Sequence, residues 1–328
     1  MTFRLHLDSK RAKPPAFHLD AAAWAKAAAR QPELAALVDV SFSWDGERLH
    51  EHLSSTDALI ASGFDRKAVN AAPRLRWIHT TGAGVDHLMP ISDFRPDLAL
   101  TNSSGIHSDK AGESALMALL MLNARMPEVM ANQRAHAWHS LMTGPIRGKR
   151  LVLIGFGDIG QAVGLAAQNL GLAVTAVTRS GTPKAEAPGI PVAPTARLDA
   201  LLPTADFVVV TAPLTEETRN LMSAARLALL PPHAGIVNMA RAALVDYPAL
   251  AQRLRDGLLG GAVLDVFDNE PLPPESAYWD VPRLVVTPHI TCDAPDYGQR
   301  VLDLWFDNFR RLRAGEALRN QVDRAQGY

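Results

Sequence analysis

The stretch Leu151–Gly160 reads L-V-L-I-G-F-G-D-I-G, an apolar run followed at once by a glycine-rich turn. The apolar run is typical of a buried strand, and residues 161–170 have the apolar spacing of a helix. Gly155 would permit a tight turn, Gly157 would let a pyrophosphate approach the backbone, and Gly160 would let the helix pack closely on the strand. The helix N-terminus would offer N–H groups and a partial positive charge to phosphate. The stretch therefore predicts a Rossmann unit that binds a dinucleotide, with an ordinary strand-to-helix turn as the alternative.

The next strand, expected from Leu172 to Val177, bears on which dinucleotide binds. NAD-binding units usually place an acidic residue about 20 positions after the glycine motif, where it accepts hydrogen bonds from the ribose. This chain instead continues with Thr178, Arg179 and Ser180. An arginine can bind a 2′-phosphate through two hydrogen bonds, and Lys184 is close enough in sequence to contribute. We expect NADPH to be preferred over NADH; a solvated loop arginine is the alternative.

Alternating strands and helices extend in both directions from this unit, which favours parallel sheets with helices on their faces. A helical tract is expected from about Lys110 to Trp138, with a break at Pro127, and an amphipathic helix from about 295 to 313. The chain thus predicts two α/β domains. Strands are expected to start at Phe3, Val38, Asp57, Arg76, Leu98, Leu151, Leu172, Phe207, Gly235, Ala262 and Leu284.

Length and composition agree with two compact domains. The 328 residues are 48% hydrophobic and 20% charged, which excludes a wholly disordered chain. A formal net charge of −1 argues against a nucleic-acid partner. The single cysteine, Cys292, excludes an intrachain disulfide and a cysteine zinc cage and suits a reducing cytoplasm. The longest clean apolar run, 115–122, is too short for a membrane span, and no signal peptide is visible, so we expect a cytoplasmic protein without a membrane partner.

Three ionisable residues follow strands of the second half of the chain. Arg241 follows I-V-N, Glu270 follows A-V-L-D-V-F, and His289 follows L-V-V-T-P. Ligands of open α/β sheets bind beyond the carboxyl ends of the strands, so these residues are candidates for chemistry. Each taken alone also has a structural explanation, such as a helix start or a proline turn.

Taken together, these motifs resemble the D-isomer-specific 2-hydroxyacid dehydrogenases, and the resemblance covers nearly the whole chain after about residue 55. Within that family the sequence is most similar to glyoxylate/hydroxypyruvate reductases, some of which also carry an arginine–serine pair at the ribose position. The motifs, in order, are T-T-G-A-G-V-D-H from Thr80, T-N-S-S-G from Thr101, the run Gly155–Gly160, T-A-P-L-T-E-E-T-R-N from Thr211, N-M-A-R-A-A-L-V-D from Asn238, L-D-V-F-D-N-E-P from Leu264 and T-P-H-I from Thr287.

The resemblance implies a role for each reacting group. His289 would donate the proton in reduction and accept it in oxidation, and Glu270 would orient the imidazole and favour its charged form. Arg241 would bind the substrate carboxylate and polarise the keto oxygen. The loop Gly82-Ala83-Gly84 would hold the same carboxylate, with Ala83 and Gly84 as substrate contacts through a nest of backbone N–H groups. The implied reaction is reduction of a small 2-oxo acid to the D-2-hydroxy acid.

The resemblance also implies an architecture and further contacts. A Rossmann cofactor domain, 102–290, would be inserted into a flavodoxin-like substrate domain, 1–101 and 291–328, both doubly wound parallel sheets with a cleft between them, in a homodimer. Asp265 would accept a hydrogen bond from the nicotinamide carboxamide. Other cofactor contacts are expected at Asp158, Ile159, Thr211, Pro213, Thr218, Met239 and Ala240. Two alternatives stay open: a D-3-phosphoglycerate dehydrogenase-like enzyme, and a dinucleotide-sensing binding protein of the corepressor type.

Several residues are left without a chemical role. We expect no metal site. The candidate is His50-Glu51-His52, and three consecutive residues do not point toward one metal ion as ligands on a helix or on several strands would, so a solvated surface is favoured. Cys292 is interpreted as packing. His136 and His139, on either side of Trp138, lie in a region that reaches across a dimer in the family, with interface packing or a substrate contact as the options. Ala242 and Gly112 stand where the family has glycine and alanine, and the methyl group of Ala242 is tolerable if its φ is negative.

Overall fold

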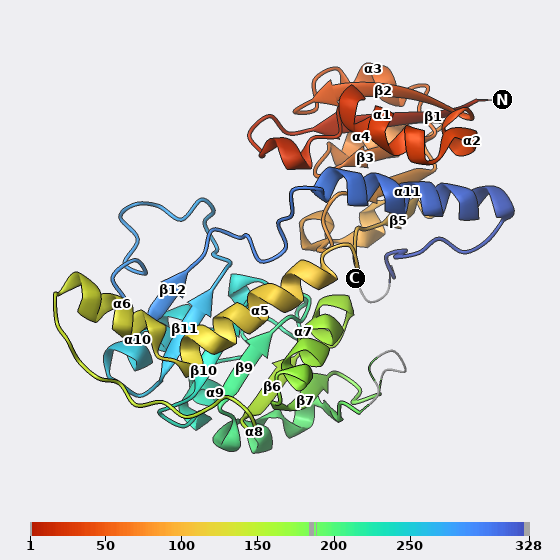
Figure 1. Cartoon of the computed structure of the whole chain (residues 1–328). Coiled ribbons are helices and arrows are strands. Elements are labelled where there is room, and N and C mark those ends of the chain that lie inside the picture. Colours follow the sequence, from red (N-terminus) through yellow and green to blue (C-terminus); the bar gives the residue numbers. More distant parts are fainter. Residues whose placement is uncertain (1, 184–186, 188, 325–328) are drawn as a thin grey trace. The chain divides into compact units, whose positions relative to one another are not determined.

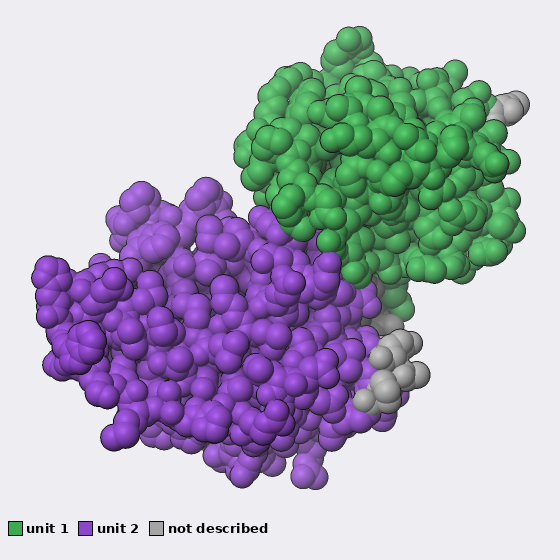
Figure 2. All heavy atoms as spheres, in the orientation of Figure 1, with its two compact units in different colours: residues 1–106, 294–328 green, residues 107–293 purple. Residues whose placement is uncertain are grey.

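The structure, a computed structural model, describes residues 2–183, 187 and 189–324. It divides into two compact units, drawn in green and purple in Figure 2. Unit 1 comprises Met1–Ile106 and Ala294–Tyr328, and unit 2 comprises His107–Asp293. Each unit contains a parallel sheet with helices, so the predicted α/β fold class is confirmed.

Unit 2 contains a seven-stranded sheet in the order β12-β11-β10-β9-β6-β7-β8, and each neighbouring pair is parallel (Figure 1). Read from β8, this is the doubly wound Rossmann order with one added strand. The order reverses between β6 and β9, where ligands of such sheets bind. The strands are β6 (Arg150–Ile154), β7 (Ala173–Thr178), β8 (Val192–Pro194), β9 (Phe207–Val210), β10 (Gly235–Asn238), β11 (Gly261–Leu264) and β12 (Leu284–Val286).

Helices cover both faces of this sheet, which explains why its strands are apolar at consecutive positions. Leu153 packs with α5 (Ser108–Asn123) and α7 (Asp158–Asn169) on one face. Ile154 packs with the opposite cluster, which includes residues of α8 (Leu198–Leu201), α9 (Ala224–Leu229) and α10 (Tyr247–Arg255). Burial of each such side chain contributes roughly 1.5–3 kcal/mol.

The structure corrects two expectations about elements. The helical tract is two helices, α5 and α6 (Met126–Arg134), separated at Arg125, whose φ is 54°. Pro127 therefore lies in the first turn of α6, where a missing N–H costs nothing, and it does not break a helix. The expected strands omitted β8, a three-residue edge strand that ends in Pro194.

Unit 1 contains a five-stranded parallel sheet in the order β2-β1-β3-β4-β5, which is the flavodoxin order (Figure 1). Its strands are β1 (Phe3–Ser9), β2 (Val38–Trp44), β3 (Ala58–Ala61), β4 (Trp77–Thr80) and β5 (Ala99–Thr101). Its helices before the crossing into unit 2 are α1 (Ala21–Arg30), α2 (Pro32–Ala35), α3 (Leu49–Leu53) and α4 (Arg66–Ala71).

The last helix, α11 (Tyr297–Ala314), completes the core of unit 1. Trp305 stacks on Trp77 of β4 at a centroid distance of 5.4 Å and on Phe309 at 5.1 Å. Helix α11 packs beside α1 on one face of the sheet (Figure 1). Neither α11 nor any other helix within the described residues has the length and apolar character needed to cross a membrane.

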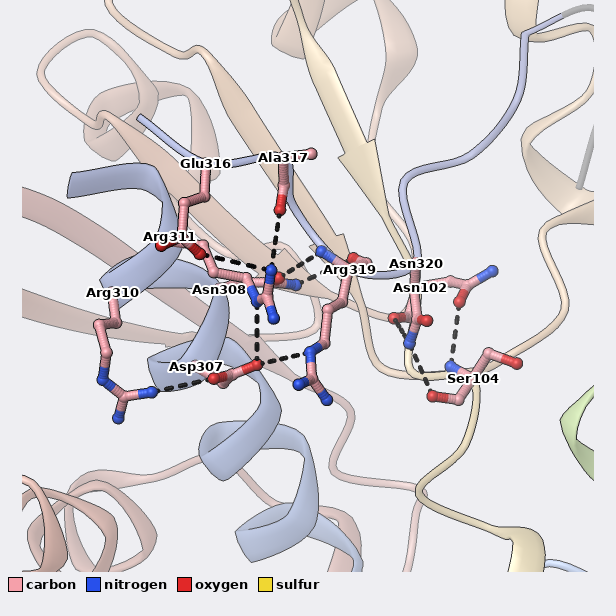
Figure 3. Close-up of polar contacts among 10 residues, drawn as sticks. All are labelled: Asn102, Ser104, Asp307, Asn308, Arg310, Arg311, Glu316, Ala317, Arg319 and Asn320. Carbon is pink, nitrogen blue, oxygen red and sulfur yellow. Dashed lines mark hydrogen bonds and ion pairs between the residues drawn. The ribbon is translucent and has the colours of Figure 1, made fainter. Parts of the chain in front are cut away.

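Polar contacts fix the chain after α11 (Figure 3). Asp307 forms ion pairs with Arg310 at 2.9 Å and Arg319 at 3.0 Å. Buried Asn308 accepts a hydrogen bond from the backbone N–H of Arg319 at 2.7 Å, and its amide donates to the carbonyl of Arg319 at 3.1 Å. Val322 then donates a backbone hydrogen bond to Leu100 of β5 at 2.8 Å. The tail is thereby attached to the edge of the sheet.

Candidate active site

The glycine motif of unit 2 has the geometry that its sequence predicts. Gly155 has a φ of 96°, and a Cβ there would lie 2.5 Å from the backbone nitrogen of Ala212. A Cβ on Gly160 would lie 2.3 Å from the carbonyl oxygen of Gly155. Gly157, the N-cap of α7, faces open space, with no atom within 4 Å of a Cβ built there. Two glycines are therefore required by packing, while the third leaves room for a phosphate at the helix N-terminus. These residues fit a dinucleotide.

Two of the predicted threonines, which follow β9, bond to backbone carbonyls: one in the glycine turn and one in their own loop. Thr211 donates through its hydroxyl to the carbonyl of Gly155 at 3.0 Å. Thr218 donates through its hydroxyl to the carbonyl of Pro213 at 2.7 Å and so closes the loop that follows β9. The structure thus shows both hydroxyls engaged in holding backbone.

The residues predicted to select the cofactor lie at the end of β7. The Thr178 hydroxyl accepts a hydrogen bond from the backbone N–H of Gly181 at 3.0 Å, which shapes the turn. The Arg179 guanidinium is 58% exposed and lies 3.7 Å from the carboxylate of Glu217. Ser180 bonds to the hydroxyl of Thr182 at 2.7 Å. Sequence reasoning missed Glu217, although it belongs to the quoted T-E-E-T-R-N motif. Lys184 lies outside the described residues.

The structure brings His289 and Glu270 together. The Nδ1 atom of His289 lies 2.7 Å from Oε2 of Glu270, and both side chains are partly exposed. The other carboxylate oxygen, Oε1, accepts a hydrogen bond from the backbone N–H of Phe267 at 2.8 Å. An ionised carboxylate only accepts hydrogen bonds, so this contact suits an N–H donor at Nδ1 and leaves Nε2 to exchange a proton with another group.

Asp265 holds the loop that carries His289. His289 has a φ of 56°, a left-handed conformation that costs roughly 1–2 kcal/mol for a residue with a Cβ. Buried Asp265 offsets this cost, since it accepts hydrogen bonds from the backbone N–H groups of Ile290 at 2.9 Å and Thr291 at 3.0 Å. It also accepts at 2.6 Å from each of the hydroxyls of Thr287 and Thr291. Sequence reasoning missed this anchoring role, whose signal is the pair of threonines two residues on either side of His289.

Arg241 is held by a separate polar cluster at the end of β10. Its backbone carbonyl accepts from the amide of fully buried Asn238 at 2.9 Å, and its guanidinium donates to the carbonyl of Ala240 at 2.7 Å. The same Asn238 amide donates to the Tyr247 hydroxyl at 3.0 Å, which in turn donates to the carbonyl of Val266 at 2.7 Å. Burial raises the pKa of Tyr247, so it remains a phenol and a hydrogen-bond donor.

A cavity of about 240 Å³ lies beside the His289 loop, entirely within unit 2. Two residues predicted to contact the cofactor, Met239 and Asp265, line it together with Thr287 and Ile290. Helix α5 closes the other side, where the Ser114 hydroxyl donates to the carbonyl of Thr291 at 3.1 Å.

The predicted substrate loop belongs to unit 1 and follows β4. Gly82 and Gly84 are not among the glycines with positive φ, so the loop lacks the alternating handedness of a nest. Ala83 and Gly84 are half-buried, and their backbone N–H groups donate no hydrogen bond within the described part of the chain. These two donors are therefore free to bind an anion, although by a different geometry from the one expected.

Cys292, Ala242 and His50 each have surroundings that suit packing or surface contacts and not chemistry. Burial raises the pKa of Cys292 to about 11, with Arg241 close enough to oppose the shift. Ala242 is not among the residues with positive φ and begins a short 3-10 helix, so its methyl group fits. The Nε2 atom of His50 lies 3.8 Å from Oδ2 of Asp65. The described residues contain no group of three or more His, Cys, Asp or Glu that could hold a metal ion.

Comparisons with known proteins agree with this geometry. Residues 116–291 match the family model described as D-isomer specific 2-hydroxyacid dehydrogenase, NAD binding domain. A glyoxylate reductase of Thermococcus onnurineus is 32% identical over 293 residues, with 85% of this chain and 86% of the relative covered. An (S)-sulfolactate dehydrogenase of Chromohalobacter salexigens is 34% identical over 251 residues, covering 75% and 80%. A D-isomer specific 2-hydroxyacid dehydrogenase from Xanthobacter autotrophicus Py2, solved with NADPH and MES, superimposes with a TM-score of 0.86 at 30% identity and full coverage of both chains.

The resemblance drawn from the sequence motifs is confirmed, since the matched family model spans more than half of the chain and the similar relatives cover three quarters or more of it. The chain therefore belongs to the D-isomer-specific 2-hydroxyacid dehydrogenase family and is an NAD(P)-dependent 2-hydroxyacid dehydrogenase.

Proposed function

We propose that this enzyme reduces a small 2-oxo acid of the glyoxylate or hydroxypyruvate type to the corresponding D-2-hydroxy acid, with NADPH as the preferred cofactor. The observation that carries the proposal is the contact between His289 and Glu270 on a loop anchored by Asp265, beside the cavity that Met239 and Asp265 line. The similarity to a glyoxylate reductase supports the substrate class.

The proposed chemistry assigns one task to each group. When bound, the nicotinamide cofactor supplies the hydride. His289 donates a proton from Nε2 to the substrate oxygen, and Glu270 holds the ring through Nδ1 and stabilises its cationic form. Arg241 binds the carboxylate and the developing oxyanion, as a planar guanidinium suits. The backbone N–H groups of Ala83 and Gly84 bind the same carboxylate.

The preference for NADPH rests on Arg179, which extends from the end of β7 and is largely exposed. In such a position a guanidinium can bind a 2′-phosphate through two hydrogen bonds. The NADPH-bound structure from Xanthobacter autotrophicus supports this choice. Glu217 competes with the phosphate for Arg179, so its carboxylate weakens the preference without reversing it.

We also assign the roles of the domains and the assembly. The cofactor domain, expected at 102–290, corresponds to unit 2 (His107–Asp293), and the substrate domain, expected at 1–101 and 291–328, corresponds to unit 1 (Met1–Ile106 and Ala294–Tyr328). A homodimer is proposed because large apolar side chains are exposed on α5, α6 and the segment that follows them. These are Met117, Leu120, Val129, Met130, Trp138 and Met142. Sedimentation at micromolar concentration should give twice the monomer mass, and Met117→Glu with Leu120→Glu should give the monomer.

A panel of 2-oxo acids tests the proposed substrate and cofactor. Purified enzyme should oxidise NADPH faster than NADH with glyoxylate or hydroxypyruvate, and more slowly with 3-sulfopyruvate or 3-phosphohydroxypyruvate. His289→Ala should lower kcat at least about 1000-fold while NADPH still binds, as judged by its fluorescence. Arg179→Asp should reverse the cofactor preference. A His289→Ala enzyme with near-normal turnover would sink the mechanism, and an unchanged cofactor ratio in Arg179→Asp would sink the NADPH assignment.

A further inference from the structure

A buried histidine connects two strands of unit 1 beneath the predicted substrate loop. His79 of β4 is fully buried and stands opposite Thr101 in the register of β4 and β5. Its Nδ1 atom lies 2.8 Å from the Thr101 hydroxyl, and its Nε2 atom lies 3.1 Å from the Ser103 hydroxyl. The Trp77 indole N–H donates to the same Thr101 oxygen at 2.8 Å. Both ring nitrogens therefore have a partner, although the mechanism proposed above does not use this residue.

One arrangement of donors and acceptors uses every contact of this cluster up to 3.1 Å, whereas the reverse one has the Thr101 hydroxyl donate to the Ile78 carbonyl at 3.5 Å and loses the bond from Ser103 to the Thr80 carbonyl. The Trp77 indole can only donate, so the Thr101 oxygen accepts from it. The Ser103 hydroxyl donates to the carbonyl of Thr80 at 2.9 Å, so its oxygen accepts from His79 Nε2–H. The Thr101 hydroxyl then donates to Nδ1. The hydrogen bonds run in one direction from Trp77 to the Thr80 carbonyl, and the imidazole in between is neutral, in agreement with a pKa that burial lowers to about 3.

This chain of hydrogen bonds ends on the backbone that leads into the substrate loop. The Thr80 carbonyl is its last acceptor. The backbone N–H of Ser103 donates to the carbonyl of Gly82 at 3.0 Å, and the Thr80 hydroxyl donates to the same carbonyl at 3.1 Å. Ser103 thus holds the peptide groups at both Thr80 and Gly82, immediately before the free N–H groups of Ala83 and Gly84.

The segment that contains Ser103 is also fixed from the C-terminal tail (Figure 3). The Asn320 amide donates to the carbonyls of Ser104 at 2.7 Å and Asn102 at 3.3 Å. The backbone N–H of Asn102 donates to the carbonyl of Asn320 at 3.1 Å. Ser103 therefore lies in a rigid segment and transmits the position of His79 to the loop.

We propose that His79 is a positioning residue for substrate binding: as a neutral Nε2–H donor to Ser103, it sets the orientation of the Ala83 and Gly84 N–H groups toward the substrate carboxylate. The inference rests on the proposed function of that loop. It predicts that the hydrogen bond between His79 and Ser103 matters for substrate affinity, whereas the one between His79 and Thr101 does not.

Two substitutions of His79 separate these bonds, because an asparagine amide reaches the position of Nδ1 and a glutamine amide reaches that of Nε2. His79→Asn should keep the bond to Thr101 and lose the donor to Ser103, raising KM for glyoxylate or hydroxypyruvate about tenfold. The KM for NADPH should be unchanged and kcat should stay within about threefold. His79→Gln should keep the donor to Ser103 and restore KM to within about threefold of the wild-type value.

His6 provides a matched control in the same sheet. It is also fully buried, bonds to the hydroxyls of Ser41 and Ser43 at 2.8 Å each, and has a pKa that burial lowers to about 4. His6→Asn should lower thermal stability but leave KM for the oxo acid unchanged. If His79→Asn does not fold, Ser103→Ala should give the same selective rise in KM.

The outcomes distinguish this inference from the proposed function. A wild-type enzyme without turnover on the 2-oxo acids would overturn the proposed function and this inference with it. An active wild type whose His79→Asn and Ser103→Ala variants keep normal KM would overturn only the role of His79. A rise in KM of equal size in His79→Gln or His6→Asn would also overturn it, since general loosening of unit 1 would then explain the effect.

Discussion

His289 and His79 both lie at the carboxyl ends of parallel strands, one in each unit, but their surroundings differ in exposure and partner. His289 is about half exposed and is paired with the carboxylate of Glu270. His79 has no exposed surface, and within the described residues its two ring nitrogens bond to the hydroxyls of Thr101 and Ser103. Burial among neutral hydroxyls lowers the pKa of His79 and keeps its imidazole neutral, whereas the partly exposed imidazole of His289 has a carboxylate oxygen within hydrogen-bond distance of Nδ1. The same residue type therefore suits proton transfer in one sheet and backbone positioning in the other.

The largest effect that the comparison predicts follows from removing the carboxylate partner. Glu270→Gln should lower kcat about 100-fold or more, because an amide has one oxygen to accept the bonds of both His289 and Phe267 N–H and carries no charge. Stopped-flow measurement of NADPH oxidation checks this, with His79→Gln as the control that keeps kcat within about threefold. A Glu270→Gln enzyme that retains a third of its activity would show that His289 does not need the carboxylate partner that distinguishes it from His79.

A second prediction concerns the anchoring of the His289 loop. Asp265→Asn should lower the free energy of unfolding by about 2 kcal/mol, because four donors then face a group that has one acceptor oxygen. It should also lower kcat, since the left-handed conformation of His289 loses its support. Urea unfolding and steady-state kinetics measure the two effects. Asp57→Asn in unit 1 is the control: Asp57 is also buried and accepts from the backbone of Arg4 at 2.9 Å, so stability should fall while kcat stays normal.

A third prediction follows from the neutral state of His79. Between pH 6.5 and about 3, the unfolded chain binds a proton at this residue that the folded chain excludes, so stability falls as the pH decreases. Lowering the pH from 7 to 5 should cost roughly 2 kcal/mol of unfolding free energy through this one residue. His79→Gln does not titrate and should flatten the dependence of stability on pH, as measured by urea unfolding at several pH values. Parallel curves for the two proteins would show that His79 accepts a proton while folded.

The smallest predicted effect concerns Cys292, three residues after His289. Since burial raises the pKa of this thiol to about 11, iodoacetamide at pH 7.5 should modify it about 100 times more slowly than a free cysteine. Cys292→Ser should change kcat less than about twofold. Mass spectrometry of the intact protein follows the modification. Rapid labelling at neutral pH would contradict the raised pKa and would show that the charged groups near His289 stabilise the thiolate of Cys292.

Sequence patterns were sufficient for the fold wherever strands were apolar on both faces, as in Leu151–Ile154. They were insufficient for β8, where three residues and a proline carry no periodic signal. They also placed the helix break at Pro127, because a proline that interrupts a helix and one that begins a helix look alike in sequence; the left-handed residue is Arg125.

For the site, motif order was sufficient to nominate His289 and Glu270, which the structure places in contact. It could not reveal what supports them. The hydrogen bonds of Asp265 depend on how the chain turns after β12, and those of His79 depend on the register of β4 with β5. Such contacts join strands through three-dimensional pairing, which no single stretch of sequence encodes.

The position of α11 in the chain also matters for protein synthesis. Trp305 and Phe309, which cover one face of the sheet of unit 1, are translated after every residue of unit 2. While the ribosome completes the chain, unit 2 is the first to have all of its residues available, and the early strands of unit 1 wait with an apolar face uncovered. Slow translation or premature termination near residue 297 would therefore leave a folded unit 2 joined to an aggregation-prone unit 1.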